Sequence, residues 1–176
     1  MELLTAIATR SSAARLIPPA PRPADLERIL EAARRAPDHG RLRPWRLMVL
    51  EGEERAQFAA AAAAAKRART PTLTEDQVAQ ERAKLIASPM IVVVGCAVVR
   101  NHKIPEIEQV IAAGAAAENL FLAAHALGYG VMWKTGAAAY DAGVKSVLGL
   151  KPDDHIVAIM HLGSPAPPLG AVPARA

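Results

Sequence analysis

The sequence predicts one domain in which helices cover both faces of a β-sheet. The run from Met90 to Val99 is continuously apolar rather than alternating, which is typical of a central strand covered on both sides. Stretches with helical periodicity separate most of the predicted strands, so a sheet flanked by helices is expected. With 176 residues, 52% of them hydrophobic, the chain is long enough to bury one sizeable core.

The first 35 residues predict two helices joined by an extended connector. Residues 2–9 carry large apolar side chains on one helical face, and a polar junction follows at residues 10–15. Four prolines in residues 16–23 preclude regular hydrogen-bonded structure there. Residues 25–35 again place apolar side chains at helical spacing, after a proline and an aspartate that favour a helix start.

Residues 34–45 concentrate four arginines, a histidine and two prolines. The prolines disfavour helical geometry at the residues before them, and Asp38 and Gly40 suit a turn, so a loop should lead into a strand that begins near Trp45. One interpretation is a solvated basic turn. The other is a loop that meets an anionic cofactor, because His39 can change protonation near neutral pH and arginines pair with phosphate or planar rings.

The middle of the chain predicts a strand over residues 45–50, helices over residues 55–69 and 74–87, and a long helix over residues 105–127. The second of these helices should begin at Thr74, which has a glutamine three residues on, and both shorter helices look mostly exposed. The long helix is apolar enough to suggest a membrane span. Its glutamate, asparagine and histidine argue instead for a buried helix of a soluble protein.

The last quarter predicts a turn, a short strand and a second turn over residues 128–136, a helix over residues 140–148 and a strand over residues 155–162. The tail from Pro165 contains little but proline, alanine and glycine, so it should be disordered unless it lies on another surface. No repeat or linker divides the chain. One domain should therefore span residues 1–176, with residues 166–176 as an extended tail that could lie on a partner subunit.

Composition and motifs exclude several functions. The net charge of +4 favours anionic small molecules slightly, but lysine and arginine form no stripe interleaved with aromatic residues, so no nucleic-acid partner is expected. The single cysteine, Cys96, lies in an apolar run, and a reduced buried thiol fits a cytoplasmic protein. No signal peptide, glycine-rich dinucleotide motif, Walker loop or metal-ligand spacing is present, so neither a metal nor a membrane partner is expected.

One polar cluster suits a phosphate. Arg10 with Ser11 and Ser12 offers a planar guanidinium and short hydroxyl donors at a helix boundary, as a phosphomonoester requires. The alternative is a solvated helix end. His39 alone would more often be a structural or surface histidine, and no local motif activates a serine as a nucleophile.

Five motifs in order resemble the flavin-dependent nitroreductase family, in particular its short subgroup. They cover nearly the whole chain, and their order at compatible spacing is more specific than any one of them. The motifs are Arg10-Ser11-Ser12-Ala13-Ala14-Arg15, Arg35-Ala36-Pro37-Asp38-His39 with Pro44-Trp45, Asn101-His102-Lys103-Ile104-Pro105, Gly130-Val131-Met132-Trp133-Lys134-Thr135-Gly136, and Leu162-Gly163-Ser164-Pro165.

This resemblance implies an α+β, nitroreductase-like fold, with a central mixed, mainly antiparallel β-sheet flanked by helices in three α/β/α layers. It implies an obligate homodimer with FMN in a groove between the subunits. The implied activity is that of an FMN-dependent NAD(P)H oxidoreductase, in which NADH or NADPH reduces the flavin and hydride passes through flavin N5 in a ping-pong cycle. The acceptor would be a small molecule such as a nitroaromatic, a quinone or an activated alkene.

The resemblance also implies roles for individual residues. The segment implicated in nicotinamide nucleotide binding comprises Ala123, Ala124, His125, Ala126, Leu127 and Gly128. The cofactor-binding positions are Arg10, Ser11 and Ser12 at the phosphate, Arg35 and His39 from the other subunit with electrostatic support for the flavin, and Trp133, Lys134 and Thr135 along the isoalloxazine ring and ribityl chain. Ser11 and Lys134 stand where the subgroup more often has arginine, and a lysine does not offer the bidentate contact of a guanidinium.

FMN is expected rather than FAD, because the cluster at Arg10 offers one terminal phosphate site and no glycine-rich loop exists for a pyrophosphate. Two alternatives have other functions. One is a flavin-binding carrier or sensor of the same fold without reductase turnover, and the other is a basic binding module unrelated to flavin. A bound yellow chromophore would exclude the second, and its bleaching by NADH or NADPH would exclude the first.

Overall fold

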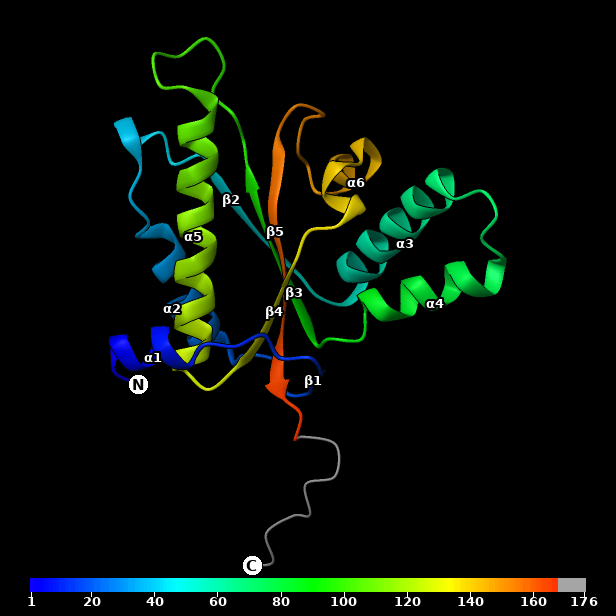
Figure 1. The fold of residues 1–176 in the computed structure, drawn as a ribbon, viewed down its shortest axis with the longest axis horizontal. Coiled ribbons are helices and arrows are strands. Elements are labelled where there is room, and N and C mark those ends of the chain that lie inside the picture. Colours follow the sequence, from blue (N-terminus) through cyan, green and yellow to red (C-terminus); the bar gives the residue numbers. More distant parts are fainter. Residues whose placement is uncertain (168–176) are drawn as a thin grey trace, which may run out of the picture.

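Strand β5 (His155–Pro165) organises the sheet by pairing with three other strands (Figure 1). The structure is a computed structural model that describes residues 1–167. β5 pairs antiparallel with β1 (Leu16–Ile17), β3 (Met90–Cys96) and β4 (Gly130–Lys134), and β3 pairs antiparallel with β2 (Trp45–Leu50). The expected α+β class is confirmed. All pairings among the described strands are antiparallel, so no parallel pair gives the sheet a mixed character.

Helices cover both faces of this sheet, as expected from the sequence. In Figure 1, α2 and α5 lie on one side, and α3 and α6 lie on the other, with α4 outside α3. The three-layer arrangement is therefore confirmed. The helices are α1 (Leu3–Thr9), α2 (Pro23–Arg34), α3 (Gly52–Arg69), α4 (Glu75–Leu85), α5 (Glu106–Ala126) and α6 (Ala142–Val147), with short 3-10 turns η1 (His39–Arg41) and η2 (Ala137–Tyr140).

Strand β3 forms the centre of both cores, because all of its residues are buried. Met90, Val92 and Val94 pack in the cluster that contains residues of α2 and α5. Ile91 and Val93 pack in the opposite cluster, with residues of α3 and α6. Successive side chains of a strand point to opposite faces, so a strand between two helical layers has to be apolar throughout. The prediction of a central, doubly covered strand is confirmed.

Two predicted boundaries are wrong, for the same physical reason. The strand expected to reach Val99 ends at Cys96, because two of the following amides donate to side chains instead of to a neighbouring strand: Asp154 accepts from Val98 N at 3.0 Å and Gln109 accepts from Val99 N at 2.8 Å. The helix expected over residues 140–148 is broken at Asp141. This residue is extended, and its carboxylate caps α6 by accepting from Val144 N at 3.1 Å.

The expectation of two mostly exposed helices over residues 55–69 and 74–87 is half right. α4 buries no residue, and its start has the predicted capping box between Thr74 and Gln77. α3, by contrast, buries Phe58 and four alanines against the sheet. Alanine contributes little to an amphipathic pattern, yet its small side chain lets a helix approach a sheet closely. The sequence pattern therefore underestimates how much of α3 is covered.

The long helix α5 has two different faces. Eight of its residues are buried, including four alanines of the run 112–117, which pack against the sheet and α2. By length and composition α5 is the one helix of the described chain that could span a membrane, but it serves as the core helix of this domain. On its other face Ile107 and Ile111 are each 63% exposed, and a side chain at Gly114 would meet open space.

The predicted tail lies almost wholly outside the described residues, which end at Pro167. Its first residue, Ala166, donates a backbone hydrogen bond to Arg15 O at 3.1 Å. The question of whether residues 168–176 lie on a partner subunit stays a prediction.

Candidate functional site

The junction Arg10–Ser12 lies beside strand β4. The next residue, Ala13, donates its N–H to Val131 O at 2.8 Å, along the edge of β4 opposite to its partner β5. Gly130 permits this approach, because a Cβ there would lie 2.6 Å from Leu16 Cδ2 and 3.0 Å from Ala13 Cβ. The first and fourth motifs, about 120 residues apart in sequence, are thus neighbours in space.

The side chains of this junction suit an anion. The Arg10 guanidinium lies over the Phe121 ring, 4.8 Å from its centre, and this cation–π contact orients it. Arg10 makes no ion pair within residues 1–167, and Ser11 and Ser12 are exposed. One oriented guanidinium and two hydroxyls are therefore available to a phosphate group, whose oxygens accept several hydrogen bonds at once.

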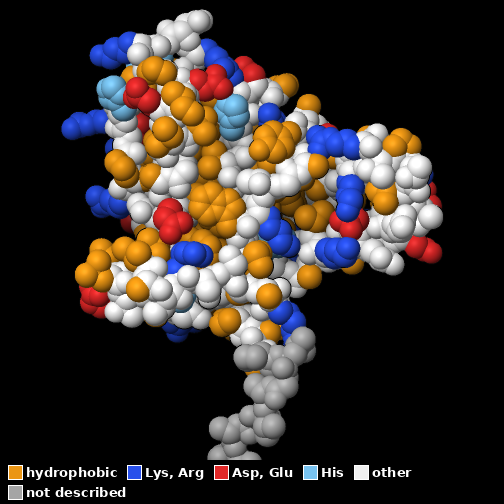
Figure 2. Space-filling view, in the orientation of Figure 1, with side chains coloured by type: hydrophobic (Ala, Val, Ile, Leu, Met, Phe, Trp, Pro, Cys, Tyr) orange, Lys and Arg blue, Asp and Glu red, His pale blue; other side chains and the backbone are white. Residues whose placement is uncertain are grey.

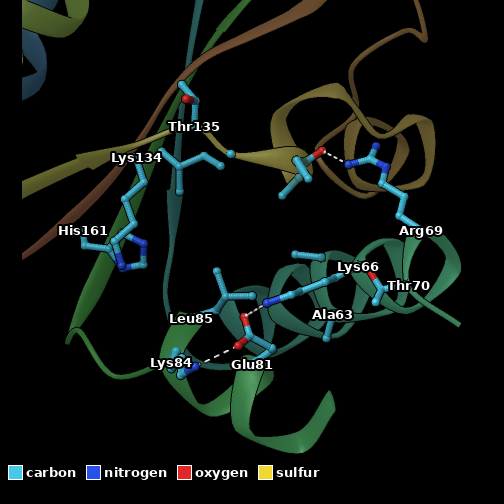
Figure 3. Close-up of a pocket in the computed structure, with 15 residues that line it drawn as sticks. Ala63, Lys66, Arg69, Thr70, Glu81, Lys84, Leu85, Lys134, Thr135 and His161 are labelled. Carbon is cyan, nitrogen blue, oxygen red and sulfur yellow. Dashed lines mark hydrogen bonds and ion pairs between the residues drawn. The ribbon is translucent and has the colours of Figure 1, made fainter. Parts of the chain in front are cut away.

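A pocket of about 770 Å³ lies between α3, α4 and the end of β4 (Figure 3), and we call it the α3–β4 pocket. Its volume is in the range of small-molecule and cofactor sites. Small apolar groups form much of its wall, and lysines, an arginine and a histidine supply polar atoms. The lining residues are Ala62, Ala63, Lys66, Arg69, Thr70, Glu81, Lys84, Leu85, Lys134, Thr135, Gly136, Ala137, Ala138, Ile159 and His161.

The charge of the α3–β4 pocket is positive, because four cations and one carboxylate line it. Figure 2 shows blue lysine and arginine side chains around the hollow between the body of the domain and the α3–α4 pair. Glu81 accepts from Lys66 at 2.7 Å and from Lys84 at 2.8 Å, and these bonds lower the pKa of its carboxyl. Within the described chain Lys134 has no such partner. Its ammonium group is therefore available to a ligand.

His161 is a buried polar residue of the pocket that sequence reasoning missed. It is 3% exposed, and its Nδ1 lies 2.8 Å from Ser88 Oγ. Burial, with a smaller contribution from Lys134, lowers the pKa of His161 to about 4, so the ring is neutral at neutral pH. Its Nε2 is buried without a hydrogen-bond partner. The available signal was one polar residue inside the otherwise apolar run Ile156–Leu162.

Trp133, Lys134 and Thr135, the three predicted flavin-binding residues at the end of β4, do not all lie on the same face of the sheet. Trp133 is partly buried and packs against the core cluster shared with α2 and α5. Lys134 and Thr135 are exposed and line the α3–β4 pocket. The alternation of strand side chains explains why Trp133 and Lys134 point in opposite directions.

Arg35 and His39 lie elsewhere in the chain. The Arg35 side chain is 80% exposed at the end of α2 and donates to Glu31 Oε1 at 2.8 Å. His39 Nδ1 lies 2.5 Å from Glu108 Oε2, near the start of α5. Neither residue lines the α3–β4 pocket. A single chain therefore does not bring them to the Lys134 site, and their expected contribution to the partner's flavin stays a prediction.

The segment Ala123–Gly128 forms the last turn of α5 and the turn after it. Ala124 has no exposed surface, so a nucleotide cannot touch this position in the single chain. His125 Nε2 lies 3.0 Å from Thr9 Oγ1, which connects the segment to the end of α1, next to Arg10. The role of the segment in nicotinamide nucleotide binding stays a prediction.

Other chemistries find little support in residues 1–167. No group of three histidine, cysteine, aspartate or glutamate side chains in this part of the chain could bind a metal ion. Cys96 is fully buried, and desolvation raises the pKa of its thiol to about 11. The thiolate form that a nucleophile requires is therefore scarce at neutral pH.

Solved structures of other proteins share this fold. A solved nitroreductase-like family protein from Bacillus cereus has a TM-score of 0.80 at 24% identity, over 99% of this chain and 92% of that one. A "putative nitroreductase in complex with fmn" from Desulfovibrio desulfuricans has a TM-score of 0.72 at 27% identity, over 100% of this chain and 92% of that one.

The sequence relatives agree with the structural ones. The chain is 35% identical over 166 residues to "Putative NAD(P)H nitroreductase YdjA" of Escherichia coli K12, which covers 94% of this chain and 89% of that protein. The model of the nitroreductase family matches residues 7–164. The chain therefore belongs to the nitroreductase family, as its five ordered motifs predicted.

Proposed function

We propose that this protein is an FMN-dependent NAD(P)H oxidoreductase that reduces nitroaromatic, quinone or activated-alkene acceptors in a ping-pong cycle in the cytoplasm. One observation carries the proposal: the Arg10–Ser12 junction and the α3–β4 pocket both adjoin strand β4. From Val131, which binds the junction, to Thr135, which lines the pocket, the strand advances about 13 Å. A phosphate at one end and a flat ring at the other fit this spacing.

The residues present suit FMN. Arg10, Ser11 and Ser12 would bind the phosphate through the guanidinium fork and two hydroxyls. Lys134 and Thr135 would bind the ring, with the methyl groups of the pocket wall against its apolar surface. The Desulfovibrio relative that was solved with FMN supports this choice of cofactor.

The chain's own contribution to the reaction would be positional and electrostatic. Bound FMN supplies the hydride chemistry between the nicotinamide donor and the acceptor. Lys66, Lys84 and Lys134 surround the ring site with positive charge, which stabilises an electron-rich ring. The name of the Escherichia coli relative supports NADH or NADPH as the electron donor.

We also propose a homodimer with one flavin shared across each interface. Leu3, Leu4 and Ile7 of α1 are 63%, 72% and 53% exposed. α1 packs beside the C-terminal end of α5, as the contact of Thr9 with His125 shows, and the exposed Ile107 and Ile111 lie toward the other end of that helix. Figure 2 shows hydrophobic side chains gathered over α1, at the lower left. A second copy of the chain would cover both helices, since large exposed apolar patches mark interaction surfaces. Arg35 and His39 would then reach the partner's flavin.

The purified protein should carry a yellow chromophore that bleaches on anaerobic addition of NADH or NADPH. Acid release followed by chromatography should identify the chromophore as FMN, because the junction offers one phosphate site. Release of FAD would contradict the assignment of the cofactor. A chromophore that neither nucleotide bleaches would favour the carrier or sensor interpretation, and a protein that binds no flavin would contradict the proposal.

Replacement of Arg10 by alanine should weaken FMN binding by about 1.5–3 kcal/mol, the usual contribution of a hydrogen bond to a charged group. Fluorescence titration of the apoprotein measures this loss. Riboflavin, which lacks the phosphate, should bind the wild type and Arg10→Ala equally. Arg28→Ala, at an exposed position of α2, is the matched control and should leave FMN affinity unchanged. Equal FMN affinity of Arg10→Ala and the wild type would mean that the phosphate binds elsewhere.

A further inference from the structure

His161 and Ser88 form a buried polar pair at the base of the α3–β4 pocket. Their residues are 3% and 5% exposed, and His161 lines the pocket. Ser88 lies between α4 and β3, whereas His161 lies on β5, so the pair joins segments 73 residues apart. Buried polar atoms nearly always have a hydrogen-bond partner, yet Nε2 of His161 has none. Such an atom is stabilised by a ligand that can supply the missing partner.

The hydrogen bonds of the pair define which kind of partner is missing. Ser88 Oγ lies 2.8 Å from His161 Nδ1 and 3.3 Å from Met90 O. A serine hydroxyl has one hydrogen, and a backbone carbonyl can only accept. Both bonds form together only if Ser88 donates to Met90 O and Nδ1–H donates to Ser88 Oγ. In that tautomer Nε2 carries a lone pair, so it requires a donor from the ligand.

Lys134 lies next to this lone pair. In Figure 3 its side chain extends toward the His161 ring, while Lys66, Glu81 and Lys84 lie across the pocket. The positive charge of Lys134 and burial both disfavour a proton on His161, so the lone pair persists at neutral pH. Lys134 makes no ion pair within the described chain, so its side chain can rotate toward a ligand. Because less than 1 Å² of Nε2 is exposed, a ligand reaches this acceptor only when the side chain beside it moves aside, and the ammonium group of Lys134 is then an adjacent donor.

A flavin ring has the complementary edge: its pyrimidine ring carries an imide N–H between two carbonyl groups. We propose that His161 Nε2 accepts a hydrogen bond from the imide N3–H of the flavin, while Lys134 donates to a neighbouring ring carbonyl. This inference rests on the proposed function, since it requires FMN in the α3–β4 pocket. In this arrangement His161 positions the flavin ring. The hydrogen bond between His161 and Ser88 selects the tautomer of His161 that can do so.

Titration of the apoprotein with FMN and with N3-methyl-FMN, which lacks the imide hydrogen, tests the proposal. The wild type should bind the methylated flavin at least about 3- to 10-fold more weakly, the loss expected for one hydrogen bond. His161→Phe replaces the imidazole by an apolar ring and should bind FMN about 3- to 10-fold more weakly than the wild type. It should then discriminate little between the two flavins. His161→Gln, whose side-chain carbonyl can accept a hydrogen bond, should recover part of the discrimination.

The outcomes separate this inference from the proposed function. Equal binding of the two flavins by the wild type would overturn the role of His161 and leave the FMN assignment intact. So would a penalty for methylation that is the same in the wild type and in His161→Phe. Failure of the wild type to bind FMN at all would overturn the proposed function and the inference with it. Because the wild-type comparison needs no substitution, the test survives if a variant fails to fold.

Discussion

A Gly114→Trp protein should sediment as a monomer and should lose FMN in the same step. A Cβ added at this position has no neighbouring atom within 4 Å in the single chain, so the domain itself should fold. In a dimer whose subunits meet along α5, the same side chain would separate the two helices. If each flavin needs residues of both subunits, the separated chains should not retain it. Sedimentation velocity and the FMN content of the same sample measure both effects.

Ala60→Trp is the matched control, because Ala60 is an exposed alanine on α3, on the other side of the sheet. It should remain dimeric and yellow. A mixed dimer adds a second arm to the experiment. With Arg10→Ala on one chain and His39→Ala on the other, a shared site leaves one of the two flavin sites intact. A wild-type monomer that binds FMN stoichiometrically would contradict both the dimer and the shared site.

The exposed face of α5 illustrates what the sequence could predict. The small residues at 112–117 would let a second helix approach closely, but four of the alanines among them pack in the chain's own core. The outward face is instead formed by Ile107, Ile111 and Gly114. An all-round apolar helix indicates burial without indicating which partner covers each side. Only the packing of α2 and the sheet against α5 distinguishes the two faces.

Local signals predicted the elements well. The continuous apolar run of β3 and the capping box at Thr74 could be predicted because each depends on residues close in sequence. The burial of α3 could not be predicted, because an alanine-rich helix has only a weak periodic pattern of hydrophobicity. Contacts between distant residues also escaped local reasoning. The hydrogen bond from Ala13 to Val131, which joins the two ends of the proposed flavin site, has no counterpart in composition or spacing.

Some residues of the candidate site could likewise be predicted from the sequence, and others could not. Arg10, Ser12 and Lys134 could be named because they lie in motifs that resemble a known family. His161 could not, because its significance depends on Ser88, on Lys134 and on an unpaired nitrogen, all of which appear only after folding. A histidine in a strand is otherwise indistinguishable from a packed core residue.

The burial of His161 has a consequence for stability. The free energy of unfolding of the apoprotein should decrease by about 2–3 kcal/mol between pH 7.5 and pH 4.5 through this one residue. Its pKa is lowered from 6.5 to about 4 in the folded chain. Between these two values the unfolded chain binds a proton that the folded chain does not, so acidification favours unfolding. Above about pH 7.5 nearly all folded and unfolded chains are neutral at this position, so little further dependence is expected from it.

Urea unfolding at several pH values, at one protein concentration and without flavin, measures this dependence. Other titrating groups contribute as well, so the informative quantity is the difference between the wild type and His161→Phe. The variant cannot bind the extra proton in its unfolded state, and its stability should therefore fall less between pH 7.5 and pH 4.5. Parallel pH profiles for the two proteins would mean that the imidazole takes up its proton equally easily in the folded chain. In that case water would have to reach Nε2, or Lys134 would have to turn away from it, so that the ring could accept a proton. The floor of the pocket would then not be closed to water, as recognition of the imide edge of a flavin requires.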